Sequence, residues 1–355
     1  MTRLLKNERG IALFLVLWVL TLLSVIAGEF CFTMRTEVNM TRNFKGQTEA
    51  YYIALAGMNR AIGELIRNEV IPPQTSSPKM FGKEEESEDE EDENRWRINT
   101  DIPPGPYGEG QFEVRIGNER GKININGANE ALLKMMLKGF NLEAQQESII
   151  VASIMDWRDK NDLHRLNGAE DDYYKSLPEP YECKNGDFDS VEELLMVRGV
   201  TPEIFYGGLK DIVTVYKPPD RKKRVSGGYR VIRPNFNAIN INAASKKVLL
   251  ALPSMTDELA QEIMNYRKNL DFRTLSEVSS LVGPDVYKDI APYITLEISP
   301  FYSITSVGKV EGSKILQGVM ALIVINKGLK KGYQIVQWRD CIPYREEQRA
   351  TSDKE

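Results

Sequence analysis

The chain has 355 residues, of which 42% are hydrophobic, so it can bury one or two cores and is not intrinsically disordered. Its net charge is −5, but residues 84–93 (EEESEDEEDE) hold nine acidic side chains, and the rest of the chain sums to +4. The acidic balance is therefore local, and the composition indicates neither a cationic nucleic-acid-binding surface nor a globally acidic one.

The N-terminal segment has the composition of a membrane-spanning helix. Residues 11–28 (IALFLVLWVLTLLSVIAG) carry no charge, and as a helix they span about 27 Å, close to the hydrocarbon thickness of a bilayer. Arg3, Lys6 and Arg9 precede this segment, and by the positive-inside rule they stay cytoplasmic while the bulk of the chain is exported. No A-x-A cleavage site follows. We therefore expect a single-pass inner-membrane protein with its C-terminal bulk in the periplasm.

The residues around Gly10 resemble the type IV prepilin leader, which a dedicated prepilin peptidase cuts after glycine before the new N-terminus is methylated. This resemblance implies a leader of residues 1–10, cleavage between Gly10 and Ile11, and N-methylation of Ile11. Most pilins carry glutamate at the fifth mature position, where this chain has Leu15. That glutamate is thought to neutralise the N-terminus of a neighbouring subunit, so a first subunit at the tip can dispense with it. A plain signal anchor is the alternative.

Beyond the membrane segment the helix is expected to continue. Residues 29–69 contain no proline, and Tyr52, Leu55, Ile62 and Ile66 follow helical spacing, which predicts an apolar stripe that packs on a globular head. Residues 72–106 combine proline, serine and acidic residues and are expected to form a mobile loop. For the acidic run in this loop, a solvated insertion is favoured over cation binding.

Strand-like alternation begins at Gly110 with QFEVRIGNERGKININ and returns near the C-terminus in FYSITSVGK, ILQGVMALIVIN and YQIVQW. If these distant segments form one antiparallel sheet against the long helix, residues 127–298 are an insertion. The predicted fold class is α+β: a type IV pilin-like fold in two parts, 29–126 and 299–340, with a large inserted α-helical domain and a charged tail at 341–355.

The insertion is internally duplicated. ININGANEALLKMML from Ile123 matches ININAASKKVLLALP from Ile239 at an offset of 116, and the segments that begin at Phe188 and Phe272 match at an offset of 84. The first copy therefore carries 32 extra residues. Both copies resemble helix-hairpin-helix modules, which raises the alternative of a membrane-anchored DNA-binding protein of competence. The G-x-G turns that hold phosphate in such modules are missing, so nucleic acid is not an expected partner.

The extra residues hold a candidate metal site. Residues 156–174 (DWRDKNDLHRLNGAEDDYY) contain six carboxylates around Gly168, and such hard oxygen donors on an adaptable backbone suit calcium better than zinc or magnesium. The spacing is not that of an EF-hand. A solvated acidic loop is the alternative.

No enzyme motif accompanies this loop. The single histidine, His164, is interpreted as a surface residue, and the sequence has no nucleophile elbow, HExxH or phosphate-binding glycine loop. We expect no enzyme and no small-molecule substrate. Three cysteines are too few for a disulfide framework, although a bond between Cys183 and Cys341 stays open in an oxidising compartment.

Several motifs together resemble general secretion pathway protein K, the largest minor pseudopilin of type II secretion. They are the WVL-containing membrane helix, GKININ, DWRD, GAEDDYY and SVEELLMVRGVTPE, and the resemblance covers most of residues 1–340. It implies a structural calcium ion in the acidic loop 156–187, with ligands from Asp159, Asn161, Asp162, Glu170, Asp171 and Asp172. Family members usually have aspartate where this chain has Asn161, so the ligand at that point differs from the family pattern.

The resemblance also implies a function in assembly. The expected protein is a minor pseudopilin whose tip complex initiates and caps the periplasmic pseudopilus, which exports folded proteins across the outer membrane. The expected partners are minor pseudopilins I and J together with H, the prepilin peptidase and the inner-membrane assembly platform. A major pilin of the fibre shaft is disfavoured, because the bulk of the insertion would clash with laterally packed neighbours.

Overall fold

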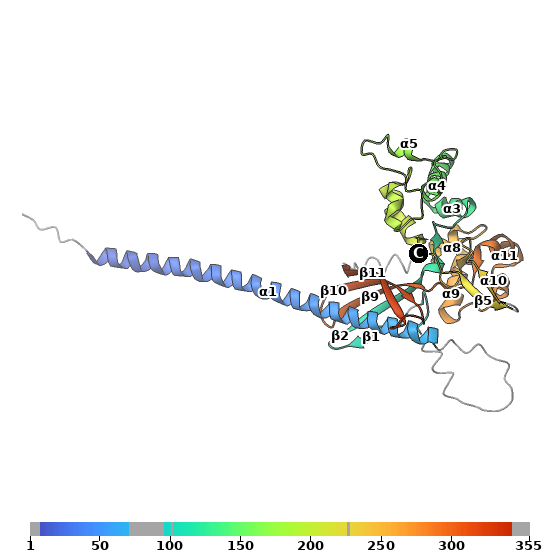
Figure 1. Ribbon diagram of the computed structural model, residues 1–355. Coiled ribbons are helices and arrows are strands. Elements are labelled where there is room, and N and C mark those ends of the chain that lie inside the picture. The colour runs from blue at the N-terminus through green and yellow to red at the C-terminus, as the bar shows by residue number, and fades with distance from the viewer. Residues whose placement is uncertain (1–7, 71–95, 101, 226–227, 343–355) are drawn as a thin grey trace, which may run out of the picture.

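The computed structural model describes residues 8–70, 96–100, 102–225 and 228–342. Its longest element is α1 (Glu8–Val70), a single helix of 63 residues that spans about 95 Å. Figure 1 shows the N-terminal part of α1 projecting from the globular region. The most apolar window of 18 residues in α1 has a mean hydropathy of 2.7 and is entirely exposed, so this helix is long and apolar enough to cross a membrane.

The C-terminal part of α1 packs on one face of a five-stranded antiparallel sheet. In sheet order the strands are β1 (Gly105–Tyr107), β2 (Gly110–Asn118), β9 (Phe301–Val310), β10 (Leu316–Ile325) and β11 (Tyr333–Ile342). Ala50, Ala54 and Met58 of α1 are fully buried against it. Gly308 of β9 lies so close to the backbone of Ala50 and Ala54 that a Cβ would not fit, so glycine is required for this close approach.

The inserted domain leaves and re-enters the sheet between two neighbouring strands. Strands β2 and β9 pair along their whole length, with Asn118 opposite Tyr302, although the chain makes a long excursion between them. The buried Asn118 side chain joins the point where the chain leaves the sheet, after β2, to the point where it returns, before β9. Its Nδ2 donates to the carbonyl oxygen of Ser299 at 2.7 Å, and its Oδ1 accepts from the backbone N–H of Ser299 at 3.0 Å.

The insertion has its own hydrophobic core and two halves. The first half contains η1 (Glu119–Gly121), β3 (Ile123–Asn124), α3 (Glu130–Leu137), η2 (Lys138–Phe140), α4 (Ala144–Arg158), α5 (Asp171–Tyr174), η3 (Val191–Met196), α6 (Pro202–Ile204), η4 (Phe205–Leu209), α7 (Lys210–Ile212) and β4 (Val213–Thr214). A ribbon follows, made of β5 (Arg221–Val225) and β6 (Gly228–Ile232). The second half contains β7 (Ile239–Asn240), α8 (Lys246–Ala251), α9 (Asp257–Asn269), α10 (Leu275–Val282), α11 (Pro284–Ile290), η5 (Ala291–Tyr293) and β8 (Ile294–Thr295).

The two halves repeat one design, as the duplicated sequence predicts. Each begins and ends in a short parallel strand pair, β3 with β4 and β7 with β8. In the first half Asn126 donates to the carbonyl oxygen of Phe188 and accepts from its N–H, at 2.9 and 2.7 Å. Asn242 makes the same two bonds to Phe272, both at 2.9 Å. One amide side chain thus closes each repeat upon itself.

An arginine completes each repeat. Arg158 donates to the carbonyl oxygens of Ile125 and Ala128, and Arg267 donates to those of Ile241 and Ala244. The sequence offset between the repeats is 109 at this arginine, between 116 before it and 84 after it. Of the 32 extra residues, seven therefore lengthen the first helix pair, and 25 form the loop between Arg158 and Phe188.

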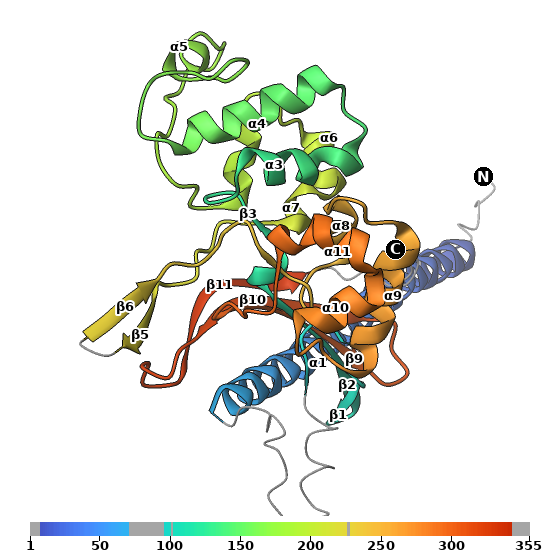
Figure 2. The ribbon, with the colours of Figure 1, turned by 90° about the vertical axis from the view of Figure 1, so that its right-hand side faces the viewer.

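The predicted α+β fold class, with a pilin-like core and an inserted helical domain, is confirmed by this architecture. Figures 1 and 2 both place α5, at the end of the first repeat, far from α1. Residues 1–7, the acidic run 84–93 and the tail from 343 onwards lie outside the described part, so the expectations for them stay predictions. Cys183 is a free buried thiol, and the side chain of Cys341 is also outside the described part.

Candidate functional site

The acidic loop that follows α4 is anchored by aromatic side chains. The Trp157 ring at the end of α4 packs edge-on to Tyr174 at 5.2 Å and stacks on Phe188 at 6.3 Å. Tyr174 in turn stacks on Tyr181 at 5.2 Å between ring centroids. Burial raises the pKa of Tyr174, so its hydroxyl stays neutral and accepts from the N–H of Arg198 at 3.3 Å. These rings fix both ends of the loop against the core.

One buried carboxylate lies beneath the loop. Asp156 is fully buried on α4, and the guanidinium Nη1 of Arg165 donates to its Oδ1 at 2.5 Å. The same Nη1 contacts Oδ2 of Asp159 at 2.6 Å, and the backbone N–H of Arg165 donates to Oδ2 of Asp156 at 3.1 Å. Gly168 packs so closely against Asp156 that no Cβ would fit there. The sequence analysis did not include Asp156 among the ligands, because nothing in the DWRD motif distinguishes a buried aspartate from an exposed one.

Glu170 is the second unusual acid of the loop. Its side chain is 2% exposed, and neither carboxylate oxygen has a hydrogen-bond partner. Burial raises the pKa of Glu170, the negative charges of Asp156, Asp159 and Asp162 raise it further, and the Cys183 thiol lowers it. A buried carboxylate without a hydrogen-bond partner is energetically costly.

The remaining predicted ligands have different surroundings. Asn161 donates to Asp159 at 2.7 Å, and Asp162 accepts from Asn185 at 2.8 Å, so both lie in the exposed part of the loop. Asp171 accepts from the N–H of Cys183 and from Lys175, both at 2.7 Å. These bonds lower the pKa of Asp171, Lys175 contributing most.

Two further side chains are exposed. Asp172 lies on the solvent side of α5, and His164 is exposed as the sequence predicts. The charges of Asp156, Asp159 and Asp162 thus act on Glu170, whereas Asp171 is half-buried and bonded to Cys183, and Asp172 is exposed.

The donors of this site fit calcium by type and charge. Carboxylate and amide oxygens are the ligands calcium prefers, and the unpartnered oxygens of Glu170 are available for one. Within the described part of the chain, no three His, Cys, Asp or Glu side chains are already gathered as a metal cluster. Two of the carboxylates instead hold Arg165, which supplies the only positive charge that the described contacts bring to Asp156.

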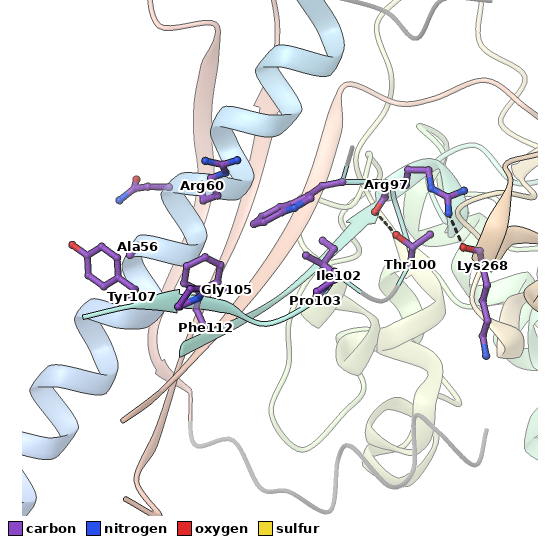
Figure 3. A pocket seen from close by; sticks show the side chains of 13 residues that line it. Ala56, Arg60, Arg97, Thr100, Ile102, Pro103, Gly105, Tyr107, Phe112 and Lys268 are labelled. Atoms are coloured by element: carbon purple, nitrogen blue, oxygen red, sulfur yellow. Dashed lines mark hydrogen bonds between the residues drawn. The ribbon is translucent and has the colours of Figure 1, made fainter. Parts of the chain in front are cut away.

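A separate cavity of about 910 Å³ lies between α1, β1 and the end of α9 (Figure 3). Its lining combines aromatic and basic side chains, including Trp96, Tyr107, Arg60 and Lys268. Arg97 bridges the wall, because it donates to the carbonyl oxygen of Lys268 at 2.6 Å. This cavity thus marks the junction between the pilin-like part and the second repeat.

Comparisons with known proteins agree with this architecture. A family model described as type II secretion system (T2SS), protein K, matches residues 116–219, and a helix-hairpin-helix motif model matches residues 234–295. These two matches fall on the first and second repeat. The polar side chains that define the second repeat, Asn240, Asn242 and Arg267, are engaged in internal hydrogen bonds.

The alignments with curated relatives cover different shares of each relative's length. Type II secretion system protein K of Pectobacterium carotovorum subsp. carotovorum is 24% identical over 220 residues, which is 56% of this chain and 61% of that protein. Putative type II secretion system protein K of Escherichia coli (strain K12) is 22% identical over 304 residues, 81% of this chain and 86% of that protein. Type II secretion system protein K of Aeromonas hydrophila is 22% identical over 312 residues, which is 80% of this chain and 86% of that protein.

A solved structure shares the fold. The GspK-GspI-GspJ complex from the enterotoxigenic Escherichia coli type 2 secretion system contains a chain that matches with a TM-score of 0.52 and 15% identity. The match covers 87% of this chain and 99% of that chain. The long exposed helix on an antiparallel sheet, with the duplicated helical insertion, defines a pilin-like protein with a large inserted domain. Within this fold, residues 116–219 match the family model of type II secretion system protein K, and the curated relatives named above carry the same description.

Proposed function

We propose that this chain is a minor pseudopilin that forms the tip complex of a type II secretion pseudopilus, and that it initiates and caps the fibre. Its proposed partners are pseudopilins I and J, which are the other components of the solved GspK-GspI-GspJ complex, together with H. Prepilin peptidase and the inner-membrane assembly platform complete the set. The protein is proposed to act as a structural component of protein export and not as an enzyme.

The observation that carries this proposal is an apolar stripe on α1 beyond the membrane segment. Phe30, Met34, Val38 and Phe44 lie within about a third of the helix circumference and are 42–71% exposed. Glu37 and Thr41 lie in the same third, so polar residues interrupt the stripe. The opposite side carries Asn39 and the exposed Phe32. Exposed apolar side chains on a helix outside a membrane indicate an interaction surface, and the proposed partner is the corresponding helix of another pseudopilin.

The position of the insertion supports a capping role. Figure 1 shows the inserted domain at the C-terminal end of α1, away from its projecting apolar part. A subunit with this bulk at one end accepts neighbours along its helix but blocks addition above its head. The absence of glutamate at Leu15 agrees with a first subunit, since no earlier neighbour has an N-terminal amine to neutralise.

Calcium is proposed to stabilise the acidic loop of this tip subunit. Asp159, Asn161, Asp162 and Glu170 are the proposed ligands, and Asp156 is added to them because it is buried and shares the Arg165 contact with Asp159. The ion would supply the positive charge that the unpartnered oxygens of Glu170 lack. The predicted ligand Asp171 already binds Lys175 and the N–H of Cys183, and Asp172 is exposed, so both would have to change their contacts to join them.

Charging the apolar stripe tests the proposed assembly. The pair Val38→Glu and Phe44→Glu is expected to reduce capture of pseudopilins I and J, and with it secretion, by at least about tenfold, because a buried unpaired charge at a helix interface costs more than 1.4 kcal/mol. Pull-down from membranes and secretion of a reporter measure this. Asn39→Glu, on the opposite side, is the matched control and should leave both intact. Normal capture by the double variant would contradict the proposal.

Leader processing is tested separately by intact mass. In cells with prepilin peptidase, the protein is expected to lose residues 1–10 and to gain one methyl group at Ile11, whereas cells without the peptidase retain the leader. Gly10→Leu should keep the leader in both, because the peptidase requires a small residue before the cut. A full-length mass in peptidase-positive cells would instead identify a plain signal anchor.

A further inference from the structure

Arg165 lies in the acidic loop where the proposed calcium ion would meet its deepest ligands. Its guanidinium contacts Asp156 at 2.5 Å and Asp159 at 2.6 Å through one nitrogen, Nη1. The loop therefore has an internal cation that satisfies two carboxylates in the metal-free chain. The neighbouring guanidinium groups have other partners, because Arg158 donates to the carbonyl oxygen of Ala128 at 2.6 Å and Arg198 donates to that of Gly168 at 3.0 Å.

The charge balance around Arg165 is incomplete. Asp156, Asp159, Asp162 and Glu170 are close enough to influence one another electrostatically, and a single guanidinium cannot neutralise four carboxylates. Arg165 also does not contact Glu170, whose two oxygens have no hydrogen-bond partner. A divalent ion would neutralise more of this charge than the guanidinium does, so the two cations compete for the same carboxylates.

Asp156 and Arg165 differ in how freely their side chains can move. Asp156 is fixed, because it is fully buried on α4 between Gly168 and the aromatic anchor. The Arg165 side chain is 39% exposed, and its neighbours Leu163 and Leu166 are 78% and 89% exposed. A segment with so few buried contacts can move at low cost, while the carboxylates stay in place.

We propose that Arg165 is a displaceable internal counter-ion: it holds Asp156 and Asp159 in the metal-free protein and gives them up when calcium binds. This inference rests on the proposed calcium site. Release of the guanidinium leaves the backbone N–H of Arg165 as the remaining described bond from segment 163–166 to Asp156, so calcium binding changes the surface that Leu163 and Leu166 present. We call the contact of Arg165 with Asp156 and Asp159 the latch. The latch also sets the calcium affinity, because each binding event must first displace this charge-assisted hydrogen-bonded pair.

The test uses Arg165→Gln in the full-length protein in detergent, with Lys160→Gln as the matched control. Lys160 is exposed in the same loop and carries the same charge. Calorimetric titration with calcium chloride is expected to show about tenfold tighter binding for Arg165→Gln, a typical size for coupled binding events, and a much smaller change for Lys160→Gln. In chelator, Arg165→Gln should lower the unfolding temperature because Asp156 loses its partner, and saturating calcium should remove this difference.

Each result decides between the latch and its alternatives. Equal or weaker calcium binding by Arg165→Gln overturns the latch and leaves the calcium site standing. The latch is also overturned if Arg165→Gln lowers the unfolding temperature by the same amount with and without calcium, because Arg165 would then be a permanent structural contact. Absence of binding by both the natural chain and Arg165→Gln overturns the latch and the proposed calcium site together. Binding by the variant alone supports the latch in its strongest form.

Discussion

Replacement of Asn126 by alanine is expected to lower the free energy of unfolding of the inserted domain by about 3 kcal/mol. The side chain makes three hydrogen bonds to backbone groups, donating to the carbonyl oxygens of Phe188 and Val215 and accepting from the N–H of Phe188. Its loss leaves these groups without a partner in a part-buried position, at about 1 kcal/mol each. It also frees the return end of the acidic loop.

Urea unfolding of the full-length protein, followed by tryptophan fluorescence, measures this effect. Trp157 lies in the core of the inserted domain and reports on its unfolding. Asn265→Ala is the control, because Asn265 is exposed on α9, its side chain accepts one described hydrogen bond, from Gln261, and its loss should change stability by less than about 0.5 kcal/mol. A loss below about 1 kcal/mol for Asn126→Ala would show that water replaces its bonds.

The second large effect concerns Glu170, whose substitution by glutamine should act in opposite directions with and without calcium. In chelator the variant is expected to be more stable than the natural chain by about 2 kcal/mol at neutral pH, because a buried carboxylate without a partner is removed. With calcium in hundredfold excess over its dissociation constant, the natural chain gains about 2.7 kcal/mol, and the variant does not.

The pH dependence follows from the raised pKa of Glu170. A carboxyl group whose pKa is higher in the folded than in the unfolded state stabilises the fold fully below its ordinary pKa of 4.5, and this contribution is lost as the pH rises through the folded value. In chelator, the natural chain should therefore lose stability relative to Glu170→Gln as the pH rises from about 4.5 to 7.

Thermal unfolding between these pH values, in chelator and in calcium, measures both effects. Glu182→Gln is the control, since Glu182 is exposed and pairs only at 3.3 Å with Lys175. If the stabilities of Glu170→Gln and the natural chain stay parallel across this pH range, Glu170 has a partner that neutralises it. That result would contradict the proposed cation beside it.

Much of the fold could be predicted from periodicity alone. The uncharged run 11–28 and the proline-free stretch after it specify one long helix, because helical spacing and bilayer thickness are both local properties of the sequence. The alternation of apolar and polar residues located β2, β9, β10 and β11. The repeated ININ segments predicted two copies of one unit. Matching residues in a duplicated sequence must make equivalent contacts, as Asn126 and Asn242 do.

The candidate site was predicted only in part. Composition identified the acidic loop and the type of ion that suits it, and it named Asp159 and Glu170 among the ligands. It did not show that Asp171 is already held by Lys175 and by the backbone N–H of Cys183. Nor did it show that Asp156 is buried, because a buried aspartate and an exposed one look the same in the sequence.

Tertiary structure alone decided how these charges are satisfied. Burial of Asp156, isolation of Glu170 and the choice of Arg165 as counter-ion all depend on how the loop returns to the Trp157 ring, and that path is set by contacts between residues distant in sequence. The sequence by itself determined the helix, the strands, the duplication and the family resemblance, because each is encoded in local spacing and composition. Electrostatic state is not local, since a carboxylate's free energy depends on the water and charges that the folded chain places around it.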